Sequence, residues 1–246
     1  HQFGITYGYD AIVERVRAII EESKDSAFAH EPLATLGDSL GLCRLRSTAS
    51  GSTAHGISIG ATEVPYLLLI DADAQGSARV IEIFGEDKLG DAVARLYERY
   101  AELLPDGPER ARAVMTAQSV AAIGWSSGDP EQRLAAVLAS DFVGIDHRHL
   151  GNWSLRGAAA YIEHLRALRQ VADDVEFRQL DVVALGPNAQ LLHVLHTGTA
   201  RAGGGVYERP FLSLFVTDAE GKLARGEWFD ADREAEALAR FDALCG

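Results

Sequence analysis

The chain has 246 residues, a formal net charge of −13 and a hydrophobic fraction of 47%, which is ordinary for a globular protein. The negative charge argues against nucleic acid and anionic membrane surfaces as partners, because both require a basic patch. No apolar run of about 18 residues is present, so the sequence predicts no membrane span.

The first part of the chain predicts a helix, four strands and a second, long helix. The first helix includes residues 13–18, and the long amphipathic helix covers residues 87–103. The strands between them are expected at residues 28–36, 40–48, 57–71 and 78–84. Residues 104–108 form a Pro/Gly cluster that we interpret as a linker, which divides the chain into domains 1–104 and 105–246.

The second part predicts helices at both ends of a sheet. Asp129 and Pro130 are a good cap and first residue for one of these helices. The expected helices are 108–123, 130–139, 157–168 and 234–244. The expected strands are 142–145, 175–183, 190–201, 207–218 and 223–230. Helices followed by an antiparallel sheet predict an α+β fold.

The second part repeats the first. Residues 63–87, aligned with residues 208–232 at a constant offset of 145, are identical at 10 of 25 positions, where chance gives about two. A match of this length indicates two copies of one domain. About 40 residues of the second copy precede the point that matches residue 1, so the first copy lacks its N-terminal helices. We expect a fragment of a longer protein; the alternative is a degenerate first copy.

Three short stretches carry a resemblance to a known family: residues 146–151, residues 227–232, and the paired segments 63–66 and 208–211. With the order of elements, they resemble the SnoaL-like group of the NTF2-like superfamily. In detail the chain resembles the C-terminal regions of large actinobacterial signalling proteins. The resemblance implies two cone folds, each a curved antiparallel sheet wrapped round helices with a pocket inside, which pair sheet to sheet as a pseudo-dimer. Family members include isomerases, cyclases and dehydratases, but others only bind ligands, so the fold does not decide the activity.

Asp146 and His147 are the sharpest candidates for chemistry, because a carboxylate beside an imidazole forms a general acid/base pair. Neighbouring residues on a strand point to opposite faces, so only one of the two enters the pocket. The alternative is that Asp146 caps a turn while His147 or Arg148 bonds to the backbone. An enzyme would add Tyr161 or Tyr207 as donor to an enolate oxygen.

A metal cluster of His147 and His149 with His193 or His196 is a further possibility. His193 and His196 have opposite strand parity, however, so they cannot both point inward. Polar strand histidines are the simpler interpretation, and we expect neither a metal nor a cofactor.

The second copy carries a large aromatic set that suits a small-molecule pocket or, alternatively, a filled core. The first copy has aliphatic residues at matching positions, which favours a pocket in the second copy. We expect its ligand-binding residues to be Asp146, His147, Trp153, Tyr161, His193, Tyr207 and Trp228. Two glutamate pairs kept in both copies, at 63/208 and 82/227, are expected to serve the fold.

These patterns predict a non-catalytic ligand-sensing or interaction module of a larger regulatory protein, with an apolar ligand in the second copy. Its other partners are expected to be the first copy and further domains of the longer chain. Two cysteines without disulfide or zinc spacing, and no signal peptide, predict a cytoplasmic location. The alternatives are an isomerase, cyclase or dehydratase with Asp146 or His147 as base, and a purely structural dimerisation module.

Overall fold

The computed structural model describes residues 5–8, 14, 25–49, 52–54, 57–59, 61–123, 130–151 and 153–245. The chain forms two compact units, His1–Ala92 and Val93–Gly246. The division falls inside helix α2 (Leu89–Leu103), whereas the Pro/Gly cluster at 104–108 suggested a later boundary. The second half of α2 belongs to unit 2, where the Tyr97 hydroxyl bonds to the carbonyl oxygens of Gly186 and Ala189.

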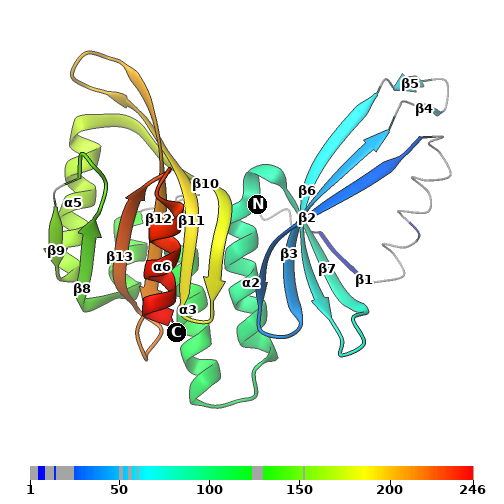
Figure 1. The fold of residues 1–246 in the computed structure, drawn as a ribbon, viewed down its shortest axis with the longest axis horizontal. Coiled ribbons are helices and arrows are strands. Elements are labelled where there is room, and N and C mark those ends of the chain that lie inside the picture. The colour runs from blue at the N-terminus through cyan, green and yellow to red at the C-terminus, as the bar shows by residue number, and fades with distance from the viewer. Residues whose placement is uncertain are drawn as a thin grey trace. The chain divides into compact units, whose positions relative to one another are not determined.

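Unit 1 is built on a five-stranded sheet in the order β1-β7-β6-β3-β2, drawn in blue and cyan in Figure 1. Its strands are β1 (Ile5–Gly8), β2 (Ala27–Leu36), β3 (Leu40–Ala49), β6 (Thr62–Ala72) and β7 (Ala78–Gly85). Strands β4 (Ser52–Ala54) and β5 (Ile57–Ile59) form a separate pair. The 3₁₀ turn η1 (Glu86–Lys88) leads into α2. The helix expected at 13–18 lies outside the described residues, except for Glu14, which is helical.

The last hairpins of the two units have the same register. Leu67 pairs with Phe84 in unit 1, and Leu212 pairs with Phe229 in unit 2, which is the offset of 145 seen in the sequence. The turns also agree, because Asp73 and Asp218 each accept two backbone N–H groups with Oδ1. Each turn has a left-handed glycine, Gly76 at φ 81° and Gly221 at φ 83°.

Unit 2 has a six-stranded sheet in the order β10-β11-β12-β13-β8-β9 (Figure 1). The strands are β8 (Leu138–Asp146), β9 (Ser154–Arg156), β10 (Ala172–Gly186), β11 (Ala189–Ala200), β12 (Val206–Thr217) and β13 (Leu223–Asp230). All neighbours are antiparallel except β13 and β8. Register shifts in β10 bend the sheet, as β-bulges do.

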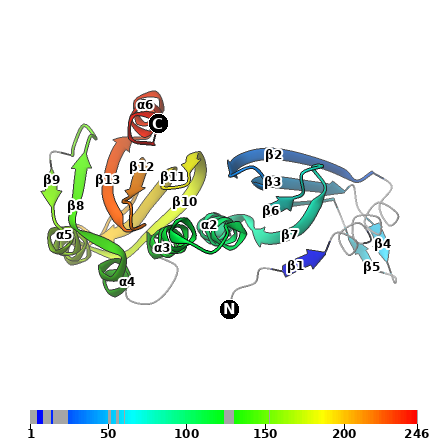
Figure 2. The ribbon, with the colours of Figure 1, turned by 90° about the horizontal axis from the view of Figure 1, so that it is seen from below.

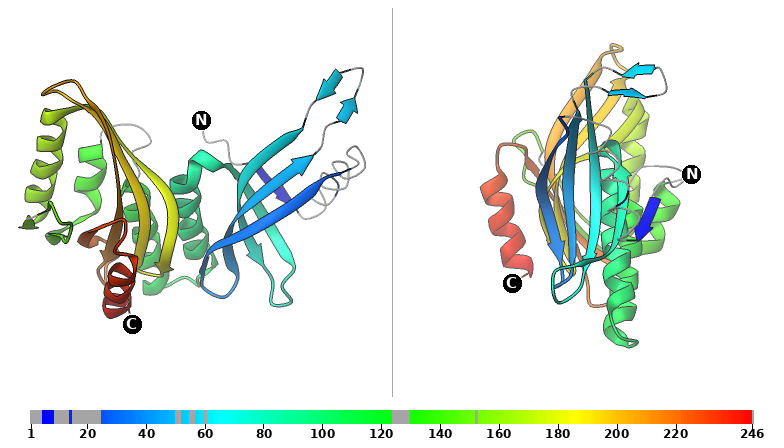
Figure 3. Two further views of the ribbon diagram at one scale, coloured as in Figure 1. Left: turned by 45° about the horizontal axis from the view of Figure 1, so that its top comes forward. Right: turned by 90° about the vertical axis from the view of Figure 1, so that its right-hand side faces the viewer.

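Helices cover both faces of this sheet, as Figure 2 and the left view of Figure 3 show. Helix α6 (Glu234–Cys245) packs on one face, where Leu191, Leu212, Leu214 and Phe229 meet Phe241. Helices α3 (Pro108–Ile123), α4 (Pro130–Val137) and α5 (Ala158–Val171) lie on the other face. Each strand therefore alternates between an α6 face and a face toward α3–α5.

Two polar contacts anchor helices within unit 2. The Tyr97 hydroxyl on α2 donates to the carbonyl oxygens of Gly186 and Ala189, at 2.9 and 2.7 Å. The Ser119 hydroxyl on α3 donates to the carbonyl oxygen of Gly221, at 2.8 Å. The Tyr97 contacts tie the second half of α2 to the β10–β11 turn of unit 2.

The prediction of an α+β fold with curved sheets and helices is confirmed. The expected strand at 57–71 is divided into β5 and β6, and the strand β1 was not predicted. The strand expected at 142–145 is longer, from Leu138 to Asp146. No helix among the described residues has the length and apolar character needed to cross a membrane.

Candidate functional site

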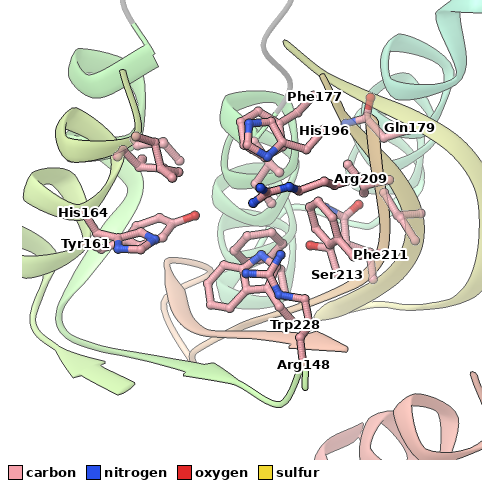
Figure 4. Close-up of a pocket in the computed structure, with 18 of the residues that line it drawn as sticks. Arg148, Tyr161, His164, Phe177, Gln179, His196, Arg209, Phe211, Ser213 and Trp228 are labelled. Carbon is pink, nitrogen blue, oxygen red and sulfur yellow. The ribbon is translucent and has the colours of Figure 1, made fainter. Parts of the chain in front are cut away.

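A cavity of about 150 Å³ lies in unit 2 between the sheet and helices α3, α4 and α5 (Figure 4). Alternate residues of the strands form its wall, as the period of two requires. Strand β11 contributes Gln190, Leu192, Val194 and His196, and strand β12 contributes Arg209, Phe211, Ser213 and Phe215. The volume equals that of an engineered cavity that holds benzene, so the space suits a ring or a chain of similar width.

Aromatic rings form the part of the wall near α5. Trp153 and Trp228 lie with ring centroids 4.9 Å apart, and His164 packs 4.3 Å from Trp153. Tyr161 on α5 lies 5.9 Å from Trp228, and its burial raises the pKa of its hydroxyl. Three expected ligand-binding residues, Trp153, Tyr161 and Trp228, therefore line the cavity.

Asp146 lies on the cavity face of β8 but is covered by Arg148. The guanidinium donates from Nε to Oδ1 and from Nη2 to Oδ2, both at 2.8 Å. Asp146 Oδ1 also accepts the backbone N–H of Arg148 at 3.1 Å, which is the turn-capping alternative considered for the sequence. Asp146 therefore positions Arg148, which lines the cavity and lies over the Phe211 ring.

His147 points to the other face of the sheet, so the expected Asp146–His147 pair does not form. Its Nε2 lies 2.9 Å from Oε2 of Glu227, and its ring stacks on Phe229 with centroids 4.5 Å apart. The reason is strand parity: Trp228 pairs with Asp146 on one face, and Glu227 and Phe229 lie on the α6 face. His147 is thus not among the residues that line the cavity.

The two histidines of β11 also divide between the faces, as their parity predicts. His193, which was expected in the ligand site, is not among the residues that line the cavity, and its Nε2 lies 3.4 Å from Oε2 of Glu234. His196 lines the cavity, stacks on Phe177 and lies 3.0 Å from the Tyr207 hydroxyl. Tyr207 does not itself line the cavity, but its hydroxyl holds the His196 ring that does.

Both imidazoles in the cavity wall are held neutral near pH 7. Burial, together with the nearby charges of Arg209 and Arg148, lowers the pKa of His196 to about 4. Burial also lowers the pKa of His164, although Asp146 opposes the shift. Within the described part of the chain, no three His, Cys, Asp or Glu side chains gather as metal ligands do.

One buried polar atom of the cavity has no protein partner. Gln190 is 2% exposed, and its side-chain oxygen Oε1 accepts no hydrogen bond from the described residues. Such an atom is costly to bury unless a donor on a ligand or a water satisfies it. Gln190 lies at the end of the cavity opposite His196, because β11 carries them six residues apart.

Several cavity residues were not expected from the sequence, above all Arg148, His164, Gln179, Gln190, Arg209 and Ser213. Strand alternation was the signal that could have identified some of them. Once His196 faces inward, Val194, Leu192 and Gln190 follow at intervals of two. His164 lies three residues after Tyr161, so helix periodicity could also have identified it. Arg148 lies in a turn, for which no such period exists.

A bent sheet and helices enclose an apolar cavity with few polar groups, an arrangement that is common among small-molecule sites. Residues 116–226, all within unit 2, match a family model described as a SnoaL-like domain. The predicted SnoaL-like resemblance is confirmed for this part of the chain.

Solved structures with a similar fold have low sequence identity. A putative SnoaL-like polyketide cyclase from Jannaschia sp. CCS1 is 16% identical, with a TM-score of 0.41, over 58% of this chain and 98% of that one. A protein with a ketosteroid isomerase-like fold from Catenulispora acidiphila, in complex with trimethylamine, is 15% identical, with a TM-score of 0.37, over 47% and 82%. An NTF2-like protein from Burkholderia thailandensis is 20% identical, with a TM-score of 0.38, over 55% and 98%.

Proposed function

We propose that unit 2 is a non-catalytic domain that binds a small, largely apolar molecule in its cavity. The open cavity supports this proposal most directly, because side chains do not fill the space between sheet and helices. The wall combines aromatic and aliphatic side chains with a few polar groups, which is the usual composition of a small-molecule site. The unpartnered Gln190 oxygen adds an acceptor for a ligand donor.

The positions of the expected bases favour binding over catalysis. Both carboxylate oxygens of Asp146 accept hydrogen bonds from Arg148. His147 bonds to Glu227 on the other face of the sheet. His196 does face the cavity, but a pKa of about 4 makes it a weak base. An isomerase, cyclase or dehydratase built on Asp146 or His147 would need to rearrange these contacts.

Binding can be tested with a variant that fills the cavity. Val194 lines the cavity, and Val194→Phe adds a ring to its interior. Leu195→Phe is the matched control, because the neighbouring side chain points to the other face. We expect 4-phenylbutyramide to bind the wild type and Leu195→Phe, and to bind Val194→Phe at least about tenfold more weakly. Equal binding to all three proteins by calorimetry would contradict the proposed site.

Catalysis is tested separately with an enolisable ketone. A domain that acts as isomerase or cyclase would exchange the α-protons of phenylacetone in heavy water faster than buffer does. We expect binding without such exchange, followed by NMR. Enzyme-dependent exchange that is lost in Asp146→Asn would overturn the non-catalytic part of the proposal.

The proposal also includes the tandem arrangement of the two units and their place in a longer protein. The shared hairpin register and turns support two copies of one domain in tandem. We infer that the copies pair with each other as a pseudo-dimer and that the module serves a larger cytoplasmic signalling protein of actinobacterial type. Unit 1 would then act as a structural or interaction partner of the ligand-binding unit.

A further inference from the structure

We propose that the ligand of the unit 2 cavity is an apolar or aromatic monocarboxylic acid, whose carboxylate binds Arg209 at the cavity mouth. This inference rests on the proposed function and adds the charge and orientation of the ligand. Its basis is an imbalance of charge among the groups that face the cavity.

The cavity wall has cations without matching anions. Two arginines, Arg148 and Arg209, line the cavity, whereas none of the described residues in its wall is an aspartate or a glutamate. The imidazoles of His164 and His196 add no charge near pH 7, because burial lowers the pKa of each. The formal charge of the wall therefore comes from the two guanidinium groups.

Arg148 is already neutralised, but Arg209 is not. Arg148 forms two hydrogen bonds to the Asp146 carboxylate, which lies just behind the wall. Arg209 instead lies over the Tyr207 ring, 5.0 Å from its centroid, and pairs with no carboxylate of the described residues. Figure 4 shows the Arg209 side chain reaching from the sheet into the space beside Phe211 and His196. A guanidinium in this position presents planar donors to a carboxylate.

The register of the strands places this charge at one end of the cavity. Arg209 pairs with His196 across β11 and β12, whereas Gln190 pairs with Phe215 six residues away. Six residues of strand span about 20 Å. Arg209 is exposed while Gln190 is buried, so the cavity has a positive mouth and a mostly apolar interior in which Gln190 Oε1 is an unpartnered acceptor. An elongated molecule with an acid at one end and a ring or chain at the other fits this gradient.

The test uses three probes with one skeleton and different charges: 4-phenylbutyrate, 4-phenylbutyramide and 4-phenylbutylamine. We expect the acid to bind the wild type about tenfold more tightly than the amide, and the amine to bind most weakly. The advantage of the acid should shrink at high ionic strength, because Arg209 is exposed to solvent. Sodium acetate should not compete at the same concentration, since it lacks the apolar body.

Variants of Arg209 identify the group responsible. Arg209→Gln should remove the preference for acid over amide, and Arg209→Lys should restore part of this preference. Arg178→Gln is the matched control, because Arg178 is an exposed arginine of β10 between the cavity residues Phe177 and Gln179. This control should keep the full preference.

The outcomes separate this inference from the proposed function. If acid and amide bind the wild type equally, or if Arg209→Gln keeps the preference, the acid ligand is wrong while the cavity remains a binding site. If acetate competes as strongly as 4-phenylbutyrate, the site binds anions without regard to an apolar body. This outcome would also overturn the inference. If none of the three probes binds and Val194→Phe behaves as wild type, the proposed function fails as well.

Discussion

His147 Nε2 lies 2.9 Å from Glu227 Oε2, on the face of the unit 2 sheet that helix α6 covers. Glu227 is fully buried and also accepts hydrogen bonds from Arg225 and Arg240. Three basic side chains therefore meet one carboxylate: His147 directly after β8, Arg225 on β13 and Arg240 on α6. This arrangement supports the expectation that Glu227 serves the fold, and it explains why His147 is unavailable to the cavity.

Replacement of Glu227 by Gln should destabilise the protein by about 2–4 kcal/mol, because it leaves partly buried cations without a counter-charge. Glu208→Gln is the matched control, since Glu208 is an exposed glutamate on the neighbouring strand. Chemical denaturation at pH 7 measures both. If Glu227→Gln lowers the free energy of unfolding by less than about 0.5 kcal/mol, the ion cluster contributes little to stability.

The same variant should reveal a pH dependence. Burial acts to raise the pKa of Glu227, but hydrogen bonds from Arg240, His147 and Arg225 outweigh it and hold the pKa below its ordinary 4.5. A carboxyl with a depressed pKa stabilises the fold above its unfolded value and loses this effect as pH falls. The stability difference between wild type and Glu227→Gln should therefore be full above pH 4.5 and narrow below it. A difference that stays constant down to pH 3 would contradict this assignment.

His196 should titrate far below an ordinary histidine. Its pKa of about 4 means that the unfolded chain binds a proton between pH 6.5 and 4 while the folded chain does not. Stability should therefore fall as pH drops through this window, by roughly 3 kcal/mol in total. NMR titration of the imidazole, assigned by its absence in His196→Gln, measures the pKa directly. A titration midpoint near pH 6.5 would show that the His196 ring is not desolvated. Bound 4-phenylbutyrate should raise the pKa of His196, because it brings a negative charge near the ring.

Gly221 should be far less replaceable than its counterpart Gly76. Both have a left-handed φ, so alanine costs each about 1–2 kcal/mol of strain. A Cβ at Gly221 would also clash with the backbone of α3 at the Arg112 carbonyl oxygen, whereas nothing lies within 4 Å at Gly76. We expect Gly221→Ala to cost at least about 2 kcal/mol more than Gly76→Ala in thermal or chemical unfolding. Equal losses would mean that α3 does not rest on this turn.

Tyr97→Phe should cost about 1–2 kcal/mol, because two carbonyl oxygens of the β10–β11 turn lose their shared donor. Tyr100→Phe, on the same helix and without such contacts, should change stability by under about 0.5 kcal/mol. Hydrogen exchange should show the β10–β11 hairpin opening more readily in Tyr97→Phe alone. An unchanged hairpin would contradict the role of α2 as part of unit 2.

The sequence by itself determined the local elements and their pairing within hairpins. The Asp218–Gly221 turn, the alternation along β11 and the Pro130 helix start all depend on neighbours in the chain, so their signals are local. Strand parity even separated His193 from His196, and the repeat located the shared hairpin of both units. The aromatic set of the second copy predicted either a pocket wall or a filled core, and Trp153, Tyr161 and Trp228 line the cavity.

Tertiary structure alone decided which face of the sheet holds the cavity and which partner each charged group finds. Glu227 and His147 are 80 residues apart, and they meet only because β8 lies parallel to β13. Arg148 and Arg209 have equal formal charge in the sequence, yet one is paired with Asp146 and the other faces the cavity mouth. Charge and parity are properties of a residue, but the electrostatic character of a site depends on long-range packing, which no local pattern encodes.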